Sequence, residues 1–354
     1  MVCSAAHVVA DPFTANDPTG PATVDWRATL AFRHYLADPG LGIAEAMDTA
    51  QRGMGLDWPT ALDLIRRTRE DLPAALVASG CGTDPLDPAQ ARTPDDVIRA
   101  CLHQVHAIQK LDARLILLAS RALARVAKGP ADDLHVYDRV LAECDHPVIL
   151  HWLGSMFDAA LAGYRGADGF EAAMDTALQV IRRNAAKVDG IKISLLDMDQ
   201  EITLRRRLPD GVRMYTGDDF NYPELIEGDA QGCSHALLGI FDPLAAAPAA
   251  APAAHAVALP GQGDTAGFRA TLDPTVPLAG LIFRARTQFY KTGVVFLAWR
   301  NGFQDHFIML TGAQAMRPLP YFTEIFRLAD TCRPLRDPDM AVHRMRKLMA
   351  LHGA

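Results

Sequence analysis

Short apolar segments alternate with longer segments of helical period between residues 6 and 237. The short segments are continuously apolar, which is typical of strands buried on both faces of a parallel sheet. The longer segments repeat their apolar side chains with the period of an α-helix. We expect about eight strands, at residues 6–10, 42–47, 75–79, 114–118, 148–152, 190–193, 212–216 and 232–237.

The segment 58–70 is one example of the expected helices. Its apolar side chains form one stripe, and Asp57 stands before Trp58 and Pro59 as a predicted N-cap. No glycine fingerprint of a dinucleotide-binding domain accompanies the repeats of strand and helix. The pattern therefore favours an α/β fold of the (β/α)8 or TIM-barrel kind, and an open doubly wound sheet is the alternative.

The pattern changes after the last expected strand. Residues 244–267 read LAAAPAAAPAAHAVALPGQGDTAG, which is typical of a surface excursion. Three amphipathic helices are expected beyond it, at 277–299, 320–329 and 337–351. The predicted organisation is a barrel over 1–243, an Ala/Pro/Gly-rich insert over 244–276 and a C-terminal helical appendage over 277–354 that packs on the barrel.

The segment 287–307 is rich in aromatic and polar side chains, Tyr290 and Lys291 among them. Two interpretations stay open for it. It lines the mouth of the barrel or a subunit contact, or it is an ordinary amphipathic helix whose polar edge is solvated.

Charge and cysteine content narrow the function classes. The chain carries 35 Lys and Arg against 42 Asp and Glu, for a net charge of −7, and lacks a basic block, which argues against nucleic acid as a partner. Six scattered cysteines without a CxxC pair indicate neither a zinc knuckle nor a disulfide framework. With no signal peptide and no long apolar run, we expect a cytoplasmic protein that does not contact membranes.

Lys192 stands inside the apolar segment VDGIKISLLDMD, residues 188–199. Burial disfavours the ammonium form of a lysine, lowers its pKa and makes the amine available as a carbonyl nucleophile. The alternative is a lysine at a strand end that reaches solvent or pairs with Asp197 or Asp199. The strand alone does not decide between these two interpretations.

The surrounding motifs add a resemblance. GIK at 190–192, PDG at 209–211, GDD at 217–219 and HVVADPF at 7–13 resemble the dihydrodipicolinate synthase and N-acetylneuraminate lyase superfamily, over most of residues 7–243. The resemblance implies a (β/α)8 barrel with C-terminal helices and a homodimer or homotetramer. It also implies that Lys192 forms a Schiff base with the substrate.

Two departures from the superfamily pattern concern the site. VILHWLG puts His151 where the superfamily has a proton-relaying tyrosine, and histidine also exchanges protons near neutral pH. The carboxylate-binding turn of the superfamily is AMDTAQRG here, which retains only Thr49 and adds Asp48. Unless Arg52 or another cation neutralises it, Asp48 would repel a substrate carboxylate, although it could instead simply close the turn or cap a helix.

Asp218 and Asp219 occupy the turn after the seventh expected strand, where the resemblance implies groups that bind substrate hydroxyls. They could also bind a divalent cation or cap the next helix. His235 falls on the eighth expected strand and could point into the barrel mouth or pack in the core.

We therefore expect a Schiff-base lyase, aldolase or dehydratase that needs no cofactor and no metal. Lys192 and His151 would be catalytic, and Asp48, Thr49, Asp218, Asp219 and His235 would bind a small keto acid or keto sugar. One alternative is a non-catalytic barrel that binds a metabolite. The other is a metal-dependent aldolase or isomerase whose ligands would be Asp11, Asp48, Asp218, His151 and His235.

Overall fold

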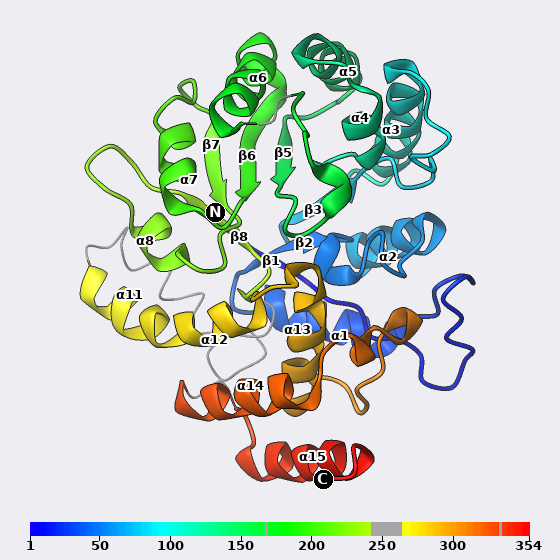
Figure 1. The fold of residues 1–354 in the computed structure, drawn as a ribbon, viewed down its shortest axis with the longest axis vertical. Coiled ribbons are helices and arrows are strands. Elements are labelled where there is room, and N and C mark those ends of the chain that lie inside the picture. Colours follow the sequence, from blue (N-terminus) through cyan, green and yellow to red (C-terminus); the bar gives the residue numbers. More distant parts are fainter. Residues whose placement is uncertain (167–168, 242–263, 333–334) are drawn as a thin grey trace.

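The computed structural model describes residues 1–166, 169–241, 264–332 and 335–354. Eight parallel strands form a closed barrel in the order of the sequence, as expected for a (β/α)8 barrel (Figure 1). The strands are β1 (Val2–Ala5), β2 (Gly42–Glu45), β3 (Val77–Cys81), β4 (Arg114–Leu117), β5 (Val148–Leu153), β6 (Val188–Ser194), β7 (Arg213–Thr216) and β8 (His235–Leu238).

Seven of the expected strands overlap the observed ones, and the first does not. The strand expected at 6–10 lies at Val2–Ala5 instead, and Cys3 pairs with Gly42 of β2 and with Leu237 of β8. Residues 6–10 are buried but leave the sheet, and the backbone N–H of Val9 donates to Thr29 Oγ1 at 3.0 Å. The apolar run is longer than one strand, so its composition alone does not locate the paired residues.

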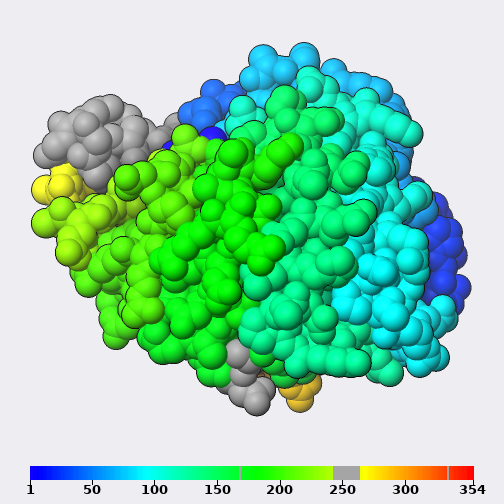
Figure 2. Space-filling view, turned by 90° about the horizontal axis from the view of Figure 1, so that it is seen from above, coloured from blue at the N-terminus to red at the C-terminus, as the bar shows by residue number. Residues whose placement is uncertain are grey.

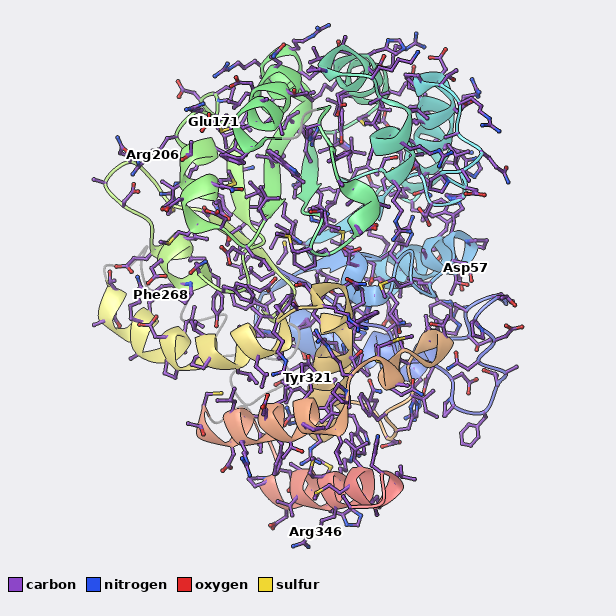
Figure 3. The ribbon with its side chains drawn as sticks, in the orientation of Figure 1. Asp57, Glu171, Arg206, Phe268, Tyr321 and Arg346 are labelled. Atoms are coloured by element: carbon purple, nitrogen blue, oxygen red, sulfur yellow. The ribbon has the colours of Figure 1, made fainter. Side chains whose placement is uncertain are left out.

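Helices surround the barrel. They are α1 (Trp26–Ala37), α2 (Trp58–Asp71), α3 (Pro94–Gln109), α4 (Arg121–Val126), α5 (Pro130–Ala142), α6 (Phe170–Arg183), α7 (Met198–Arg205) and α8 (Tyr222–Glu227), with short 3-10 turns η1 (Asp48–Ala50), η2 (Ala159–Leu161) and η3 (Ala185–Lys187). Asp57, labelled in Figure 3, caps α2 as expected, because its carboxylate accepts from the N–H of Thr60 at 2.9 Å. Seen from above, the green and cyan segments of the chain form one continuous face (Figure 2).

The C-terminal helices gather below the barrel in Figure 1. They are α11 (Thr265–Leu272), α12 (Val276–Ile282), α13 (Tyr290–Arg300), α14 (Leu319–Thr331) and α15 (Pro338–Leu351), with 3-10 turns η5 (Asp273–Thr275), η6 (Thr287–Phe289) and η7 (Leu310–Met316). Residues 244–263 of the expected insert lie outside the described residues, and Phe268 of α11 is fully buried. The division of the chain into three domains stays a prediction.

The single helix expected at 277–299 is two helices, α12 and α13. No proline interrupts residues 283–289. The Arg317 guanidinium instead donates to the carbonyls of Arg284, Ala285 and Arg286 at 2.8, 3.1 and 2.8 Å, which holds this segment outside a helix. Next to it, Tyr321 of α14, labelled in Figure 3, donates from its hydroxyl to the carbonyl of Ile282 at 3.0 Å.

The core has an inner and an outer part. The inner cluster fills the barrel with small side chains such as Ala44 and Ala78, branched ones such as Ile116, and the large ring of Tyr215. The outer cluster joins the barrel strands to the surrounding helices and includes Phe268, Phe283 and Phe296 of the C-terminal part. Among the helices that the structure describes, none combines the length and the apolar character that a membrane crossing requires.

Candidate active site

Lys192 lies in the middle of the barrel wall. It pairs in register with His151 of β5 and Tyr215 of β7, and only 7% of the residue is exposed. Burial lowers the pKa of Lys192 below its ordinary value, while the carboxylates of Asp219 and Asp48 act in the opposite direction. The amine is therefore easier to deprotonate than that of a solvated lysine, as imine formation requires.

The lysine borders a narrow space at the carboxyl ends of the strands, where barrels of this kind hold their sites. The space has a volume of ≈ 10 Å³, about that of one water molecule. Phe157, Phe283 and Tyr290 supply aromatic walls, and the Phe283 and Tyr290 rings stack with centroids 4.4 Å apart. The side chains that bring polar groups to it are Asp48, Thr49, Lys192, Ser194, Asp219 and Tyr290.

Gly217, the residue after β7, makes room for the lysine. A Cβ atom at this position would lie 2.7 Å from Cε of Lys192 and 2.1 Å from Oγ of Ser194. Any larger residue would therefore displace the Lys192 side chain from its observed path.

Asp219 faces Lys192 from the loop after β7. Burial raises the pKa of Asp219 to about 7, although the N–H of Ile240, 2.8 Å from Oδ1, and the charge of Lys192 both favour its ionised form. Both protonation states of this carboxyl group are therefore populated near neutral pH. Such a group can accept a proton and return it.

Asp48 and Thr49 lie together in the 3-10 turn after β2, and both border the space beside Lys192. The hydroxyl of Thr49 shares a hydrogen bond of 2.8 Å with the hydroxyl of Tyr290 on α13. Tyr290 is 4% exposed. A C-terminal helix thus contributes to the mouth of the barrel, in line with the first of the two interpretations of 287–307.

His151 lies on the strand next to Lys192 and is 1% exposed, with its Nε2 atom 3.4 Å from Oγ of Ser194. Burial holds the pKa of His151 well below its ordinary value, and the charges of Lys192 and Arg165 lower it further. The imidazole is therefore neutral at neutral pH. It borders a second, larger cavity rather than the space beside Lys192.

The carboxylate of Asp218 is engaged in its own loop. It accepts from the backbone N–H groups of Phe220 and Asn221 at 2.8 and 3.1 Å, and from Asn221 Nδ2 at 2.8 Å. Asp218 does not border the space beside Lys192. Asp218 thus binds donors of its own loop, and the N-cap residue of the next helix is Asn221; a role of Asp218 in hydroxyl binding stays a prediction.

His235 lies at the other end of the barrel. It begins β8, and its Nδ1 atom is 2.6 Å from the N-terminal amine of Met1. Burial and the positive N-terminus lower the pKa of His235 to about 4. The expectation that His235 reaches the barrel mouth is wrong, because the amino end of a parallel strand lies opposite the site.

The larger cavity has a volume of ≈ 250 Å³ and shares Asp48 and Leu153 with the space beside Lys192. Arg52 lines it but does not neutralise Asp48, because its guanidinium forms two hydrogen bonds to Asp84 at 2.8 and 2.9 Å. The other charged residues of this cavity are Asp84, Arg121 and Asp158. They follow different strands and share no local motif, so no sequence pattern pointed to them.

The ligands of the metal-dependent alternative do not come together. Asp11 lines a separate surface hollow with Asp305 and His306, and His235 lies at the opposite end of the barrel. Within the described residues, no group of three or more His, Cys, Asp or Glu side chains is arranged to hold a metal ion.

Comparisons with solved structures agree with this geometry at the level of fold. Dihydrodipicolinate synthase from Aquifex aeolicus is 13% identical, with a TM-score of 0.68 over 95% of this chain and 100% of that chain. The enzyme from Acinetobacter baumannii, complexed with pyruvate, is 15% identical, with a TM-score of 0.68 over 95% and 100% of the two chains. YagE, a prophage protein of the dihydrodipicolinic acid synthase family from E. coli K12 in complex with pyruvate, is 14% identical, with a TM-score of 0.70 over 94% and 98%.

The expected resemblance is thus confirmed for the fold, on a sequence that has diverged far from these enzymes. A comparison with curated proteins finds no match. One family model, described as "Protein of unknown function (DUF993)", matches residues 1–354. The chain, whose fold is similar to that of dihydrodipicolinate synthases, belongs to the DUF993 family.

Proposed function

We propose that this protein is a lyase or aldolase that forms an imine between Lys192 and a small keto compound. The observation that carries the proposal is the position of Lys192, a buried lysine that faces Asp219 and borders a narrow space at the barrel mouth. Two solved structures of the same fold contain pyruvate, which supports a small carbonyl compound as the ligand class. A homodimer or homotetramer and a cytoplasmic location stay predictions.

The proposed reaction starts with attack of the neutral Lys192 amine on the substrate carbonyl carbon. The carbinolamine loses water and leaves a protonated imine. When the substrate carbon–carbon bond breaks, its electron pair moves into the imine and forms an enamine, and the β-hydroxyl group loses its proton to a base. A proton then returns to the enamine carbon, and water releases the product from Lys192.

Several groups are available for these proton transfers. Asp219 is suited to accept and return a proton because its pKa is about 7. Tyr290 and Thr49 form a hydrogen-bonded pair of hydroxyl groups that borders the space, and His151 is a neutral imidazole one strand away from Lys192. A catalytic role of His151 and a binding role of Asp48 stay proposals.

The test is borohydride reduction of the protein in the presence of 2-oxo acids and keto sugars, followed by intact-mass and peptide mass spectrometry. We expect a covalent adduct on the peptide that contains Lys192. No adduct from any compound of the panel would contradict the imine mechanism. Binding of such a compound without an adduct would favour the non-catalytic barrel.

The pH dependence of imine formation provides a prediction about Asp219. Only the neutral amine attacks, so the rate rises with pH until it passes the pKa of Lys192, which lies below the ordinary value. Asp219 raises the pKa of Lys192 by stabilising the ammonium form. In Asp219→Asn the midpoint of the rate profile should therefore shift to lower pH, as measured by the initial rate of borohydride trapping.

Asp112→Asn is the matched control, since it makes the same substitution at a side chain that is 87% exposed. Its midpoint should stay at the wild-type pH. An upward shift or an unchanged midpoint in Asp219→Asn would mean that this carboxylate does not control the amine.

A further inference from the structure

The site differs in charge from one that would hold a 2-oxo acid. We infer that the carbonyl compound taken by Lys192 is an uncharged hydroxy ketone, the compound class of ketoses and their fragments. The inference rests on the proposed imine at Lys192 and specifies its substrate class.

The charges beside the Lys192 amine speak against a substrate that carries a carboxylate. Among the described residues that border this space, Lys192 is the single cation, and Asp48 and Asp219 bring two carboxyl groups. The protonated imine would already have these carboxylates as partners. A substrate carboxylate on the adjacent carbon would enter as a third acidic group in a buried site, where like charges repel strongly.

Three backbone N–H groups of the turn after β2 also speak against a substrate carboxylate. The N–H groups of Ala50 and Arg52 donate to the carbonyl of Met47 at 3.0 and 3.4 Å, and that of Gln51 donates to the carbonyl of Asp48 at 2.8 Å. These internal bonds of the turn leave the three N–H groups occupied. They are not available to hold an incoming carboxylate.

The donors at the end of β8 are occupied in the same way. The N–H of Ile240 donates to Oδ1 of Asp219 at 2.8 Å, so a carboxyl group of the protein already occupies this donor. Asp219 therefore takes the position in which a substrate anion would find a backbone donor.

Two further cations lie near Asp48, and the charge of one of them, Lys291, interacts with Asp48 although both cations have other hydrogen-bond partners. The Arg52 guanidinium is bound to Asp84 and also donates to Gln104 Oε1 at 2.8 Å. The Nζ atom of Lys291 donates to the carbonyl of Gln288 at 3.1 Å and lies 4.7 Å from the centroid of the Tyr290 ring. Neither cation borders the space beside Lys192.

The site thus combines two carboxyl groups with hydroxyls that both donate and accept hydrogen bonds, and Lys192 is the one cation among the described residues that border it. Two carboxyl groups and the hydroxyls of Thr49, Ser194 and Tyr290 face the space. A ligand that brings hydroxyl donors on the carbons next to its carbonyl complements this arrangement, because a carboxylate accepts hydrogen bonds from hydroxyls strongly. A hydroxy ketone has that structure and no charge.

The test compares two ligands with the same carbon skeleton, hydroxyacetone and pyruvate. Each reacts with the Lys192 amine to give an imine and water, and borohydride then adds hydride to the imine carbon and leaves a stable secondary amine. Trapping rates are measured by intact mass and divided by the rates of the same ketones with N-acetyl-lysine, which removes their intrinsic reactivity. We expect the normalised rate with hydroxyacetone to be at least about tenfold higher, equivalent to about 1.4 kcal/mol.

The variant Asp48→Asn removes one carboxylate at nearly constant volume. We expect it to lower the ratio of hydroxyacetone to pyruvate trapping by about tenfold, since less repulsion opposes pyruvate. The control is Asp112→Asn, an equal charge change at a side chain that is 87% exposed and lies before β4. The control should leave the ratio as it is in the wild type.

The outcomes separate the two proposals. Equal or faster normalised trapping of pyruvate by the wild type would overturn the hydroxy ketone and leave the imine at Lys192 intact. Adducts with neither compound, nor with dihydroxyacetone, would remove the imine and the inference with it. The wild-type ratio decides the substrate class even if Asp48→Asn does not fold.

Discussion

Replacement of Lys192 by methionine is expected to abolish the borohydride adduct and to lower turnover of the trapped compound by roughly four to six orders of magnitude, as removal of a covalent nucleophile does. Methionine matches the length of the lysine and places no charge in the buried site. The free energy of unfolding should not fall, because burial opposes the ammonium form of Lys192. The measurements are steady-state turnover, intact mass after reduction, and urea unfolding followed by circular dichroism.

The control for this variant is Lys347→Met, at an exposed position of α15. It should be trapped at the wild-type rate. If Lys192→Met retained the adduct, peptide mapping would locate it on another amine. The buried Lys291 would then be the first candidate.

The largest effect on stability is expected for Arg33→Met, which breaks a buried ion pair between α1 and β2. The guanidinium forms two hydrogen bonds to Glu45 at 2.9 and 3.0 Å, and both side chains are 0% exposed. Removal of the arginine leaves the Glu45 carboxylate buried, with Thr68 Oγ1 and the N–H of Ala46 as its remaining donors. Loss of one partner from such a pair costs about 3–5 kcal/mol in the free energy of unfolding.

Urea unfolding of three variants compares the contribution of this buried pair to the free energy of unfolding with that of a surface pair. Arg66→Met removes an ion pair with Asp63 whose side chains are 39% and 33% exposed, and it should cost less than about 1 kcal/mol. Arg33→Met combined with Glu45→Leu should recover part of the loss, because two apolar side chains replace the whole pair. A loss in Arg33→Met no larger than in Arg66→Met would contradict a structural role of the buried pair.

Much of the fold could be predicted because parallel strands that are buried on both faces leave an apolar signal in the sequence. Strand β6 and helix α2 lie where periodicity and the Asp57 cap indicated. Strand β1 does not, because the apolar run that contains it continues into residues that are buried outside the sheet. The break between α12 and α13 depends on Arg317, and a contact so distant in the chain leaves no local signal.

The candidate site was predictable only in part, because local sequence shows neither exact strand bounds nor contacts between distant residues. Lys192 and Asp219 could be located because one stands inside a recognisable apolar strand, β6, and the other follows β7 in the turn. His235 could not be placed, since a shift of the strand bounds by a few residues moves a side chain from one end of the barrel to the other. The Thr49–Tyr290 hydrogen bond joins residues 241 positions apart, so only the folded chain reveals this pair.

The narrowness of the space beside Lys192 has a consequence for affinity. A volume of ≈ 10 Å³ is smaller than a keto compound, so we expect a substrate to bind to molecules in which this space is wider. The apparent Kd is then the intrinsic Kd divided by the open fraction, and an open fraction of about 1% would weaken binding about 100-fold. Because Tyr290 belongs to α13 whereas Lys192 belongs to β6, changes in the seating of the C-terminal helices would tune substrate affinity from outside the barrel strands.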